Sequence, residues 1–107
     1  MGLSTHVLDT MHGVPAGGMQ VALYTTKDGA ATLVRHITLN HDGRNPDGLL
    51  YDTSSLKAGT YRLVFEVASY FNAMGAELPH PPFLDQVPLD FGIADPAGHY
   101  HVPLLVS

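Results

Sequence analysis

The sequence contains no cysteine and few basic residues, and each shortage excludes a class of protein. Without cysteine there is no disulfide, no thiolate metal site and no cysteine nucleophile. The five lysine and arginine residues are scattered and the formal net charge is -5, so no basic stripe is available to neutralise phosphates. We therefore expect binding neither to nucleic acid nor to a membrane surface.

Targeting signals are also lacking, and the composition is that of a single domain. The N-terminus has no basic segment followed by an apolar one, and no apolar run approaches the ~18 residues of a membrane-spanning helix. This predicts a cytoplasmic protein. Of the 107 residues, 45% are hydrophobic and 14% charged, which is enough apolar material for one domain over residues 1–107. So small a domain would gain stability from oligomerisation.

Turn signals recur at short intervals and divide the chain into short β-prone runs. Many short strands with regular turns are typical of a sandwich or barrel. Alternation is clearest in residues 60–68, where Tyr61, Leu63 and Phe65 face one way. The expected strands are residues 4–9, 19–26, 31–39, 49–53, 60–68, 84–93 and 100–106.

Two local signals refine this all-β prediction. One short helix is expected at residues 69–74, because Ser69 is a good N-cap and Gly75 suits the left-handed conformation at a helix C-terminus. Pro88 cannot donate to a β-ladder, so its strand is expected at a sheet edge or at a bulge.

Alternation also places two histidines away from the core. In the last expected strand, His101 shares a face with Pro103 and Leu105, opposite a more apolar face that should pack inward. In the first expected strand, His6 shares a face with Leu8 and points outward by the same reasoning. Two outward histidines on a partly apolar surface indicate an interface or a ligand cleft.

Other chemistries have weaker support. Arg44 follows the tight turn at residues 40–43, where its guanidinium could hold a carbonyl or an anion, or simply be solvated. His99 and His101 also fit a metal site if His6 supplied a third ligand, but no cluster of His, Asp and Glu fixes one. Neither a Gly-x-Ser-x-Gly elbow nor a phosphate-cradling loop is present.

Three segments resemble the signature segments of 5-hydroxyisourate hydrolases in the transthyretin-like family. They are residues 3–9 (LSTHVLD), 40–44 (NHDGR) and 99–107 (HYHVPLLVS), and the regions 59–71 and 81–85 are similar as well. The resemblance covers the whole chain in order. It implies a transthyretin-like (prealbumin-like) β-sandwich with one short helix, assembled as a homotetramer in which two dimers enclose a central channel.

The resemblance also implies an activity, the hydrolysis of 5-hydroxyisourate to 2-oxo-4-hydroxy-4-carboxy-5-ureidoimidazoline in urate degradation. This reaction requires neither a metal nor an organic cofactor. Which histidine acts as the base stays open, and His99 is treated as secondary. The implied catalytic and substrate-binding residues are His6, Arg44 and His101, and the implied channel-lining residues are Leu8, Pro103 and Leu105.

The end of the sequence departs from the family pattern. The hydrolases end in a Tyr-Arg-Gly-Ser tail that contributes to the active site, whereas this sequence ends at Ser107. Bare apolar strands at a terminus aggregate, so a further strand or another chain should pair with residues 100–106. We therefore expect the final strand of the sandwich to be missing from this chain, which leaves the activity of the chain as written uncertain.

A binding protein without catalytic activity is the alternative function. Transthyretin shares the fold implied by the resemblance but carries thyroid hormones in its channel. That channel does not offer the combination of His6, Arg44 and His101, and the sequence therefore favours the enzyme.

Overall fold

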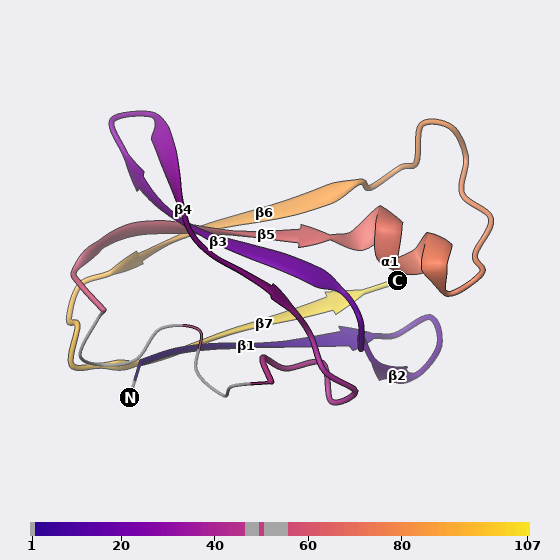
Figure 1. The fold of residues 1–107 in the computed structure, drawn as a ribbon, viewed down its shortest axis with the longest axis horizontal. Helices are drawn as coiled ribbons and strands as arrows, with labels where there is room; N and C mark the ends of the chain where they lie inside the picture. Colours follow the sequence, from indigo (N-terminus) through magenta and orange to yellow (C-terminus); the bar gives the residue numbers. More distant parts are fainter. Residues whose placement is uncertain (1, 47–49, 51–55) are drawn as a thin grey trace.

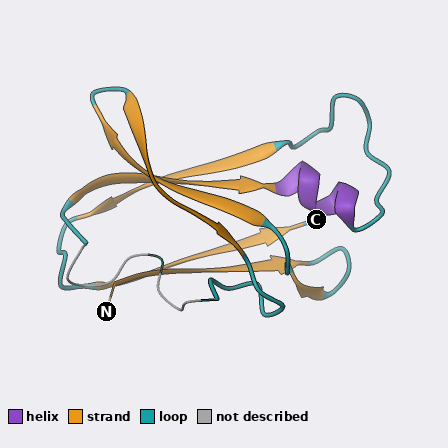
Figure 2. Ribbon diagram, in the orientation of Figure 1, coloured by secondary structure: helices purple, strands orange, loops and turns teal. Residues whose placement is uncertain are grey.

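Two β-sheets and one short helix make up the fold of the computed structural model (Figures 1 and 2). The structure describes residues 2–46, 50 and 56–107. The described strands form a three-stranded sheet of order β2-β1-β7 and a four-stranded sheet of order β4-β3-β5-β6. Their bounds are β1 Gly2–Asp9, β2 Val14–Pro15, β3 Gln20–Lys27, β4 Ala30–Thr38, β5 Gly59–Glu66, helix α1 Val67–Ala73, β6 Gln86–Ile93 and β7 His99–Val106.

The pairing of β1 with β7 places the N-terminal and C-terminal strands of the described chain side by side (Figure 1). These strands run parallel over all 8 residues of β1, from Gly2 opposite His99 to Asp9 opposite Val106. The other described strand pairs are antiparallel. Segments almost a full chain length apart therefore share one sheet, and side chains from both can meet on one face.

The core lies between the two sheets and follows the alternation of the sequence. In β5, Tyr61, Leu63 and Phe65 are buried, whereas Arg62 and Glu66 on the other face are half-buried. Full burial of a Leu or Phe side chain contributes roughly 1.5–3 kcal/mol. The predicted inward face of this strand is confirmed.

The helix begins earlier than predicted. α1 starts at Val67, so the predicted strand over residues 60–68 ends at Glu66, and Ser69 lies inside the helix rather than at its N-cap. The backbone N–H groups of Val67 and Ala68 instead donate to the carbonyl oxygen of Asp85, at 3.1 and 3.0 Å. A backbone oxygen from the segment before β6 thus satisfies the first helical amides, which local sequence could not reveal.

The C-terminal end of α1 is as predicted. Gly75 has a φ of 87°, its N–H donates to the carbonyl oxygen of Asn72, and the N–H of Ala76 donates to that of Phe71. These two bonds form a Schellman motif, in which a left-handed residue satisfies the last helical carbonyls.

β4 departs from the expected alternation at one point. Leu33, Arg35 and Ile37 alternate in the sequence and would share one face of a regular strand, but the register with β3 shifts between Leu23 and Tyr24. A bulge of one residue moves the following side chains to the opposite face. Leu33 is consequently 56% exposed, while Ile37 is buried. The β3–β4 hairpin projects beyond the rest of its sheet in Figure 1.

Four further expectations concern strands, sheet edges and membranes. Pro88 lies in β6, at an edge of the described four-stranded sheet, which confirms that prediction. β7 is at an edge of the described three-stranded sheet, and the additional strand expected beside it stays a prediction. The expected strand at residues 49–53 lies outside the described residues, except Leu50, whose N–H donates to the carbonyl oxygen of Leu3. Within the described part of the chain, no helix is long and apolar enough to cross a membrane.

Candidate functional site

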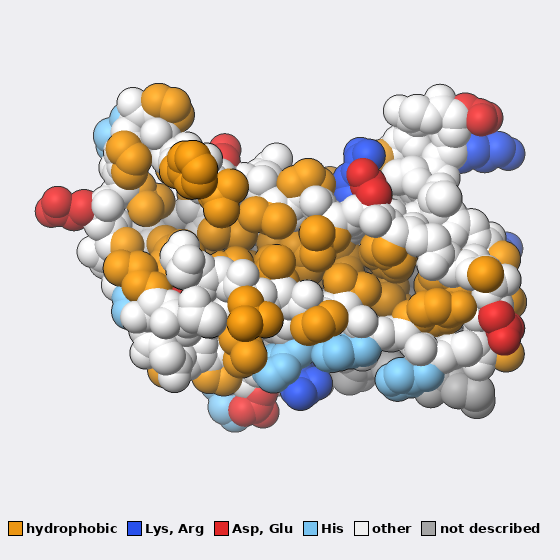
Figure 3. Space-filling view, turned by 180° about the vertical axis from the view of Figure 1, so that it is seen from behind, with side chains coloured by type: hydrophobic (Ala, Val, Ile, Leu, Met, Phe, Trp, Pro, Cys, Tyr) orange, Lys and Arg blue, Asp and Glu red, His pale blue; other side chains and the backbone are white. Residues whose placement is uncertain are grey.

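The outer face of the three-stranded sheet carries the residues that the sequence singled out. In β1, Thr5 and Val7 are buried, whereas His6 between them is half-buried. In β7, His101 is exposed and Val106 is buried. The outward orientation of both histidines is therefore confirmed. Figure 3 shows histidine side chains beside a basic side chain, next to an extensive apolar region.

The strand register arranges this outer face in rows. Ser4 is opposite His101 and His6 is opposite Pro103. Leu8 is opposite Leu105 in the next row, and Leu105 is 63% exposed. Cross-strand neighbours on one face contact each other directly. Polar groups thus occupy the first rows of the sheet, and apolar side chains border them.

Arg44 reaches this face through a tight turn that is fastened to β1. The N–H of Val7 donates to the carbonyl oxygen of Gly43 at 3.0 Å, and Arg44 forms a β-bridge with His6. Gly43 has a φ of 72°, and a Cβ at this position would collide with the carbonyl oxygen of Val7. Only glycine allows the turn to approach β1 so closely.

Asn40 organises the same turn from within. Its side-chain oxygen accepts hydrogen bonds from the backbone N–H groups of Asp42, at 2.9 Å, and Arg44, at 3.1 Å. Its own N–H donates to the carbonyl oxygen of Arg44 at 2.8 Å. An asparagine side chain that satisfies turn amides in this way is a common means of fixing loop geometry. The hydrogen bonds of this turn therefore hold Arg44 in place beside β1.

The two outward histidines have different partners. Nη2 of Arg44 lies 3.3 Å from Nδ1 of His6, within hydrogen-bonding distance. Oγ of Ser4 lies 2.9 Å from Nδ1 of His101. Each imidazole is held at the same ring nitrogen, but one faces a permanent cation and the other faces a neutral hydroxyl.

Electrostatics favour an uncharged His101. Partial burial lowers the pKa of its imidazole, and the nearby Arg44, His6 and His99 lower the pKa further. A depressed histidine pKa leaves the neutral form, which can accept a proton, dominant at neutral pH. His99, which was predicted to have a secondary role in the site, lies on the same strand and is one of the groups that lower the pKa of His101.

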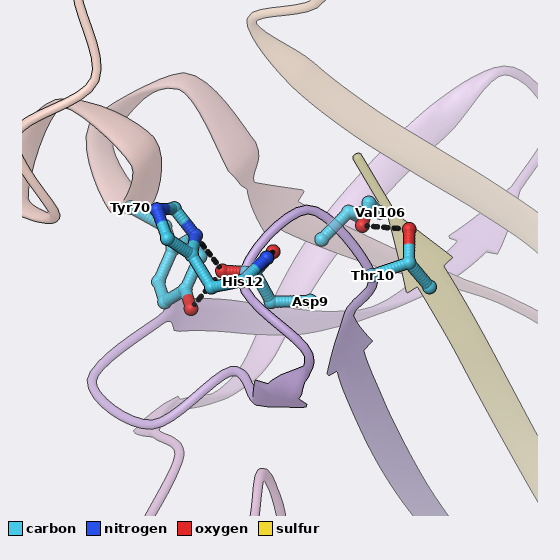
Figure 4. Close-up of polar contacts among 5 residues, drawn as sticks. All are labelled: Asp9, Thr10, His12, Tyr70 and Val106. Atoms are coloured by element: carbon cyan, nitrogen blue, oxygen red, sulfur yellow. Dashed lines mark hydrogen bonds and ion pairs between the residues drawn. The ribbon is translucent and has the colours of Figure 1, made fainter.

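A second polar cluster, which the sequence reasoning missed, lies at the end of β1 (Figure 4). The buried carboxylate of Asp9 accepts hydrogen bonds from the hydroxyl of Tyr70 at 2.7 Å and from the backbone N–H of His12 at 3.0 Å. Nδ1 of His12 lies 2.5 Å from the same carboxylate. Burial raises the pKa of Asp9, but the hydrogen bonds from Tyr70 and His12 outweigh it and lower the pKa.

Tyr70 responds in the opposite sense. Burial raises the pKa of its hydroxyl, and the hydrogen bond to Asp9 and the charge of that carboxylate raise it further. Nearby, the hydroxyl of Thr10 donates to the carbonyl oxygen of Val106 at 2.9 Å (Figure 4). The cluster ties α1 and the turn after β1 to the end of the sheet, so we interpret it as structural.

Neither a surface hollow nor a metal-binding cluster offers a better candidate site among the described residues. A surface hollow beside α1 is lined by residues that include Ser69, Asn72, Glu77 and His80, and it contains none of the predicted site residues. Among the described residues, no group of three or more His, Cys, Asp or Glu side chains could hold a metal ion. The outer face of β1 and β7 is therefore the candidate site that the geometry supports best.

Comparison with known proteins places the chain. The model of the HIUase/Transthyretin family matches residues 3–107. The chain belongs to the HIUase/Transthyretin family. Within this family, the 5-hydroxyisourate hydrolase 2 of Rhizobium meliloti (strain 1021) is 50% identical over 105 residues, which cover 98% of this chain and 87% of the relative.

Solved structures of HIUase/Transthyretin relatives share the fold. Transthyretin from Sparus aurata superposes with a TM-score of 0.84 at 26% identity, over 98% of this chain and 87% of that one. The 5-hydroxyisourate hydrolase of Klebsiella pneumoniae gives a TM-score of 0.75 at 31% identity, over 99% of this chain and 89% of that one. The predicted transthyretin-like β-sandwich is confirmed. Because the family includes both transthyretins and hydrolases, the fold alone does not choose between binding and catalysis.

Proposed function

We propose that this protein hydrolyses 5-hydroxyisourate to 2-oxo-4-hydroxy-4-carboxy-5-ureidoimidazoline, a step in urate degradation. The observation that carries the proposal is the meeting of His6, Arg44 and His101, from three separate segments, on one outward face. The 50% identity to a protein named 5-hydroxyisourate hydrolase supports the same substrate.

The chemistry required matches these three side chains. Hydrolysis of a cyclic amide needs a base that takes a proton from water and a donor that stabilises the developing oxyanion. A neutral imidazole suits the first task, and the paired N–H donors of a guanidinium suit a planar, electron-rich heterocycle. We assign the positioning and activation of water to the pair His6 and His101, of which one is the base, and the orientation of substrate and stabilisation of charge to Arg44.

The reaction balances without a cofactor. The oxygen of water forms a bond to the ring carbonyl carbon, and an imidazole takes the proton that water releases. The carbon–nitrogen bond of the ring then breaks, and the departing nitrogen receives that proton. No oxidation state changes, and the three side chains supply the base and the oxyanion donor, so the proposed step draws on neither a metal nor an organic cofactor.

The apolar part of the face supports an assembled site. Leu8, Pro103 and Leu105 adjoin the polar groups. The side chain of Leu105 is 63% exposed. Exposed apolar residues beside a polar site are typical of surfaces that another subunit covers. We infer a homotetramer, a dimer of dimers, in which two such faces meet and these three residues line a channel. Native mass spectrometry of the wild type and of Leu105→Arg measures the number of subunits in the assembly. A monomeric wild type would contradict the proposed tetramer.

Turnover of freshly made 5-hydroxyisourate, followed by ultraviolet absorbance, tests the activity. Replacement of His6, Arg44 or His101 by Ala should each lower kcat/KM about a hundredfold or more, because each removes a base or a charge donor. His36→Ala is the matched control, since His36 is an exposed histidine on the other sheet and should change nothing. Near-native turnover in all three site variants would overturn the assignment, and thyroxine binding without turnover would favour a carrier.

A further inference from the structure

The two histidines of the site are held by partners with different hydrogen-bonding capacity. Both contacts involve Nδ1: Arg44 lies 3.3 Å from His6, and Ser4 lies 2.9 Å from His101. A neutral imidazole has one N–H and one lone pair, and the partner at one nitrogen decides which of them the other nitrogen presents. These contacts therefore bear on which ring is the base.

The contact with Arg44 determines which ring nitrogen of neutral His6 carries the proton. A guanidinium has only N–H donors and remains charged, so the Nδ1 atom of His6 must accept the hydrogen bond from Arg44. The proton of the neutral ring then lies on Nε2. In this state His6 presents an N–H group to a ligand rather than a lone pair, which suits stabilisation of an oxyanion and not abstraction of a proton.

Ser4 is able to hold His101 in the complementary state. A serine hydroxyl can accept as well as donate, and acceptance from Nδ1–H leaves the Nε2 lone pair of His101 free. The backbone fixes the pair, because Ser4 and His101 are direct partners in the β1–β7 ladder. The hydroxyl of the adjacent Thr5 also donates to the carbonyl oxygen of Val102 at 2.7 Å, which secures the register at this point.

We propose that Ser4 is a positioning residue whose hydroxyl accepts a hydrogen bond from Nδ1–H of His101, which makes His101 the base and leaves His6 as a donor. This inference rests on the proposed function for its chemical meaning. Water gives its proton to Nε2 of His101 as its oxygen bonds to the carbonyl carbon. The carbonyl electrons move onto oxygen, where Nε2–H of His6 and the N–H groups of Arg44 stabilise the charge. His101 then passes the proton to the leaving ring nitrogen.

The same assignment agrees with the electrostatics of the face. Arg44, His6 and His99 are the charged and titratable groups that act on His101, and partial burial together with these groups lowers its pKa. A ring that resists protonation keeps its Nε2 lone pair available at neutral pH. An imidazole with an exposed lone pair is the form that a general base requires.

Nitrogen-15 NMR of the full-length protein labelled at histidine tests the proposal without any substrate. At a pH where the rings are neutral, we expect the pattern of a protonated Nδ1 for His101 and of a protonated Nε2 for His6. Ser4→Ala should let His101 populate both forms, whereas Ser4→Thr should restore the wild-type pattern. A protonated Nε2 on wild-type His101, or no change in Ser4→Ala, would overturn the proposal even if the enzyme is active.

Kinetics supply a second and independent readout. Ser4→Ala should lower kcat about two- to tenfold with little change in KM, as expected for loss of one hydrogen bond that orients the base. Ser4→Thr should recover most of the rate. Ser69→Ala, an exposed serine in α1, is the matched control.

The pH profile reports the direction of the hydrogen bond. An acceptor at Nδ1–H stabilises the imidazolium more than the neutral ring, so its removal lowers the pKa of His101. The acid limb of kcat/KM should consequently move to lower pH in Ser4→Ala. A limb that stays in place or moves to higher pH contradicts an accepting hydroxyl. Absence of turnover in the wild type, with the NMR pattern intact, would instead reject the proposed function alone.

Discussion

The two histidine-containing clusters on and after β1 use one residue type in opposite ways. On the outer face, the half-buried imidazole of His6 contacts the guanidinium of Arg44. After the strand, His12 contacts the buried carboxylate of Asp9, which also binds Tyr70 (Figure 4). The imidazole of His6 thus lies on a face that a ligand can reach, whereas the imidazole of His12 takes part in a buried structural cluster.

This comparison predicts a separation of effects. Changes in the Asp9 cluster should reduce the free energy of unfolding and leave kcat of the folded protein nearly intact. Changes on the outer face should reduce turnover and leave stability nearly intact. Active sites are commonly less optimised for stability than their supports, so the separation is physically reasonable.

The largest expected loss of stability comes from Asp9→Ala. This change leaves the buried hydroxyl of Tyr70 without its acceptor and opens a space at the end of β1, for a loss of about 3 kcal/mol. Urea unfolding followed by circular dichroism measures it. Asp42→Ala is the control, because Asp42 is an exposed aspartate in the turn before Arg44. Equal midpoints for the two variants would contradict a supporting role for Asp9.

Tyr70→Phe should have a smaller effect. The ring stays packed, and only the hydrogen bond to the Asp9 carboxylate is lost, which corresponds to about 1–2 kcal/mol of unfolding free energy. Thermal and urea unfolding of Tyr70→Phe and of Tyr24→Phe, which lies on β3, make the comparison. The idea of a structural cluster would be weakened if Tyr70→Phe abolished turnover and spared stability.

Acid should weaken the same cluster gradually. The pKa of Asp9 is lower in the folded protein than its ordinary value of 3.8, so the stability that Asp9 contributes is present above that value and is lost as the pH falls through the folded pKa. Tyr70→Phe removes a hydrogen bond that lowers this pKa. The stability difference between the wild type and Tyr70→Phe should therefore shrink as unfolding is measured from pH 7 toward pH 3. A difference that is constant with pH would show that the carboxylate is not involved.

The smallest stability effects are expected on the outer face. His6→Ala and His101→Ala remove partly or fully exposed side chains, so each should change the free energy of unfolding by about 0.5 kcal/mol or less. The same denaturant series measures them beside the turnover assay. A loss as large as that of Asp9→Ala would show that these histidines support the fold rather than the chemistry.

Alternation in the sequence was sufficient to predict the outward side of β1 and β7 and the inward side of β5. These predictions succeeded because successive side chains of any strand point to opposite faces, whatever the partner strand is. The same local reasoning failed for Leu33, where a bulge shifts the register, and for Ser69, where the carbonyl of Asp85 replaces a side-chain cap.

The sequence by itself determined the longer strands of the two sheets, the faces of β1, β5 and β7, and the residue types capable of hydrolytic chemistry. Only the tertiary structure decided that His101 lies beside Ser4, that Arg44 reaches His6, and that Asp9 meets Tyr70. The physical reason is one of range. Propensity and periodicity act over a few residues, whereas the parallel β1–β7 register and the turn on Gly43 join segments far apart along the chain, and such contacts depend on how the whole core packs.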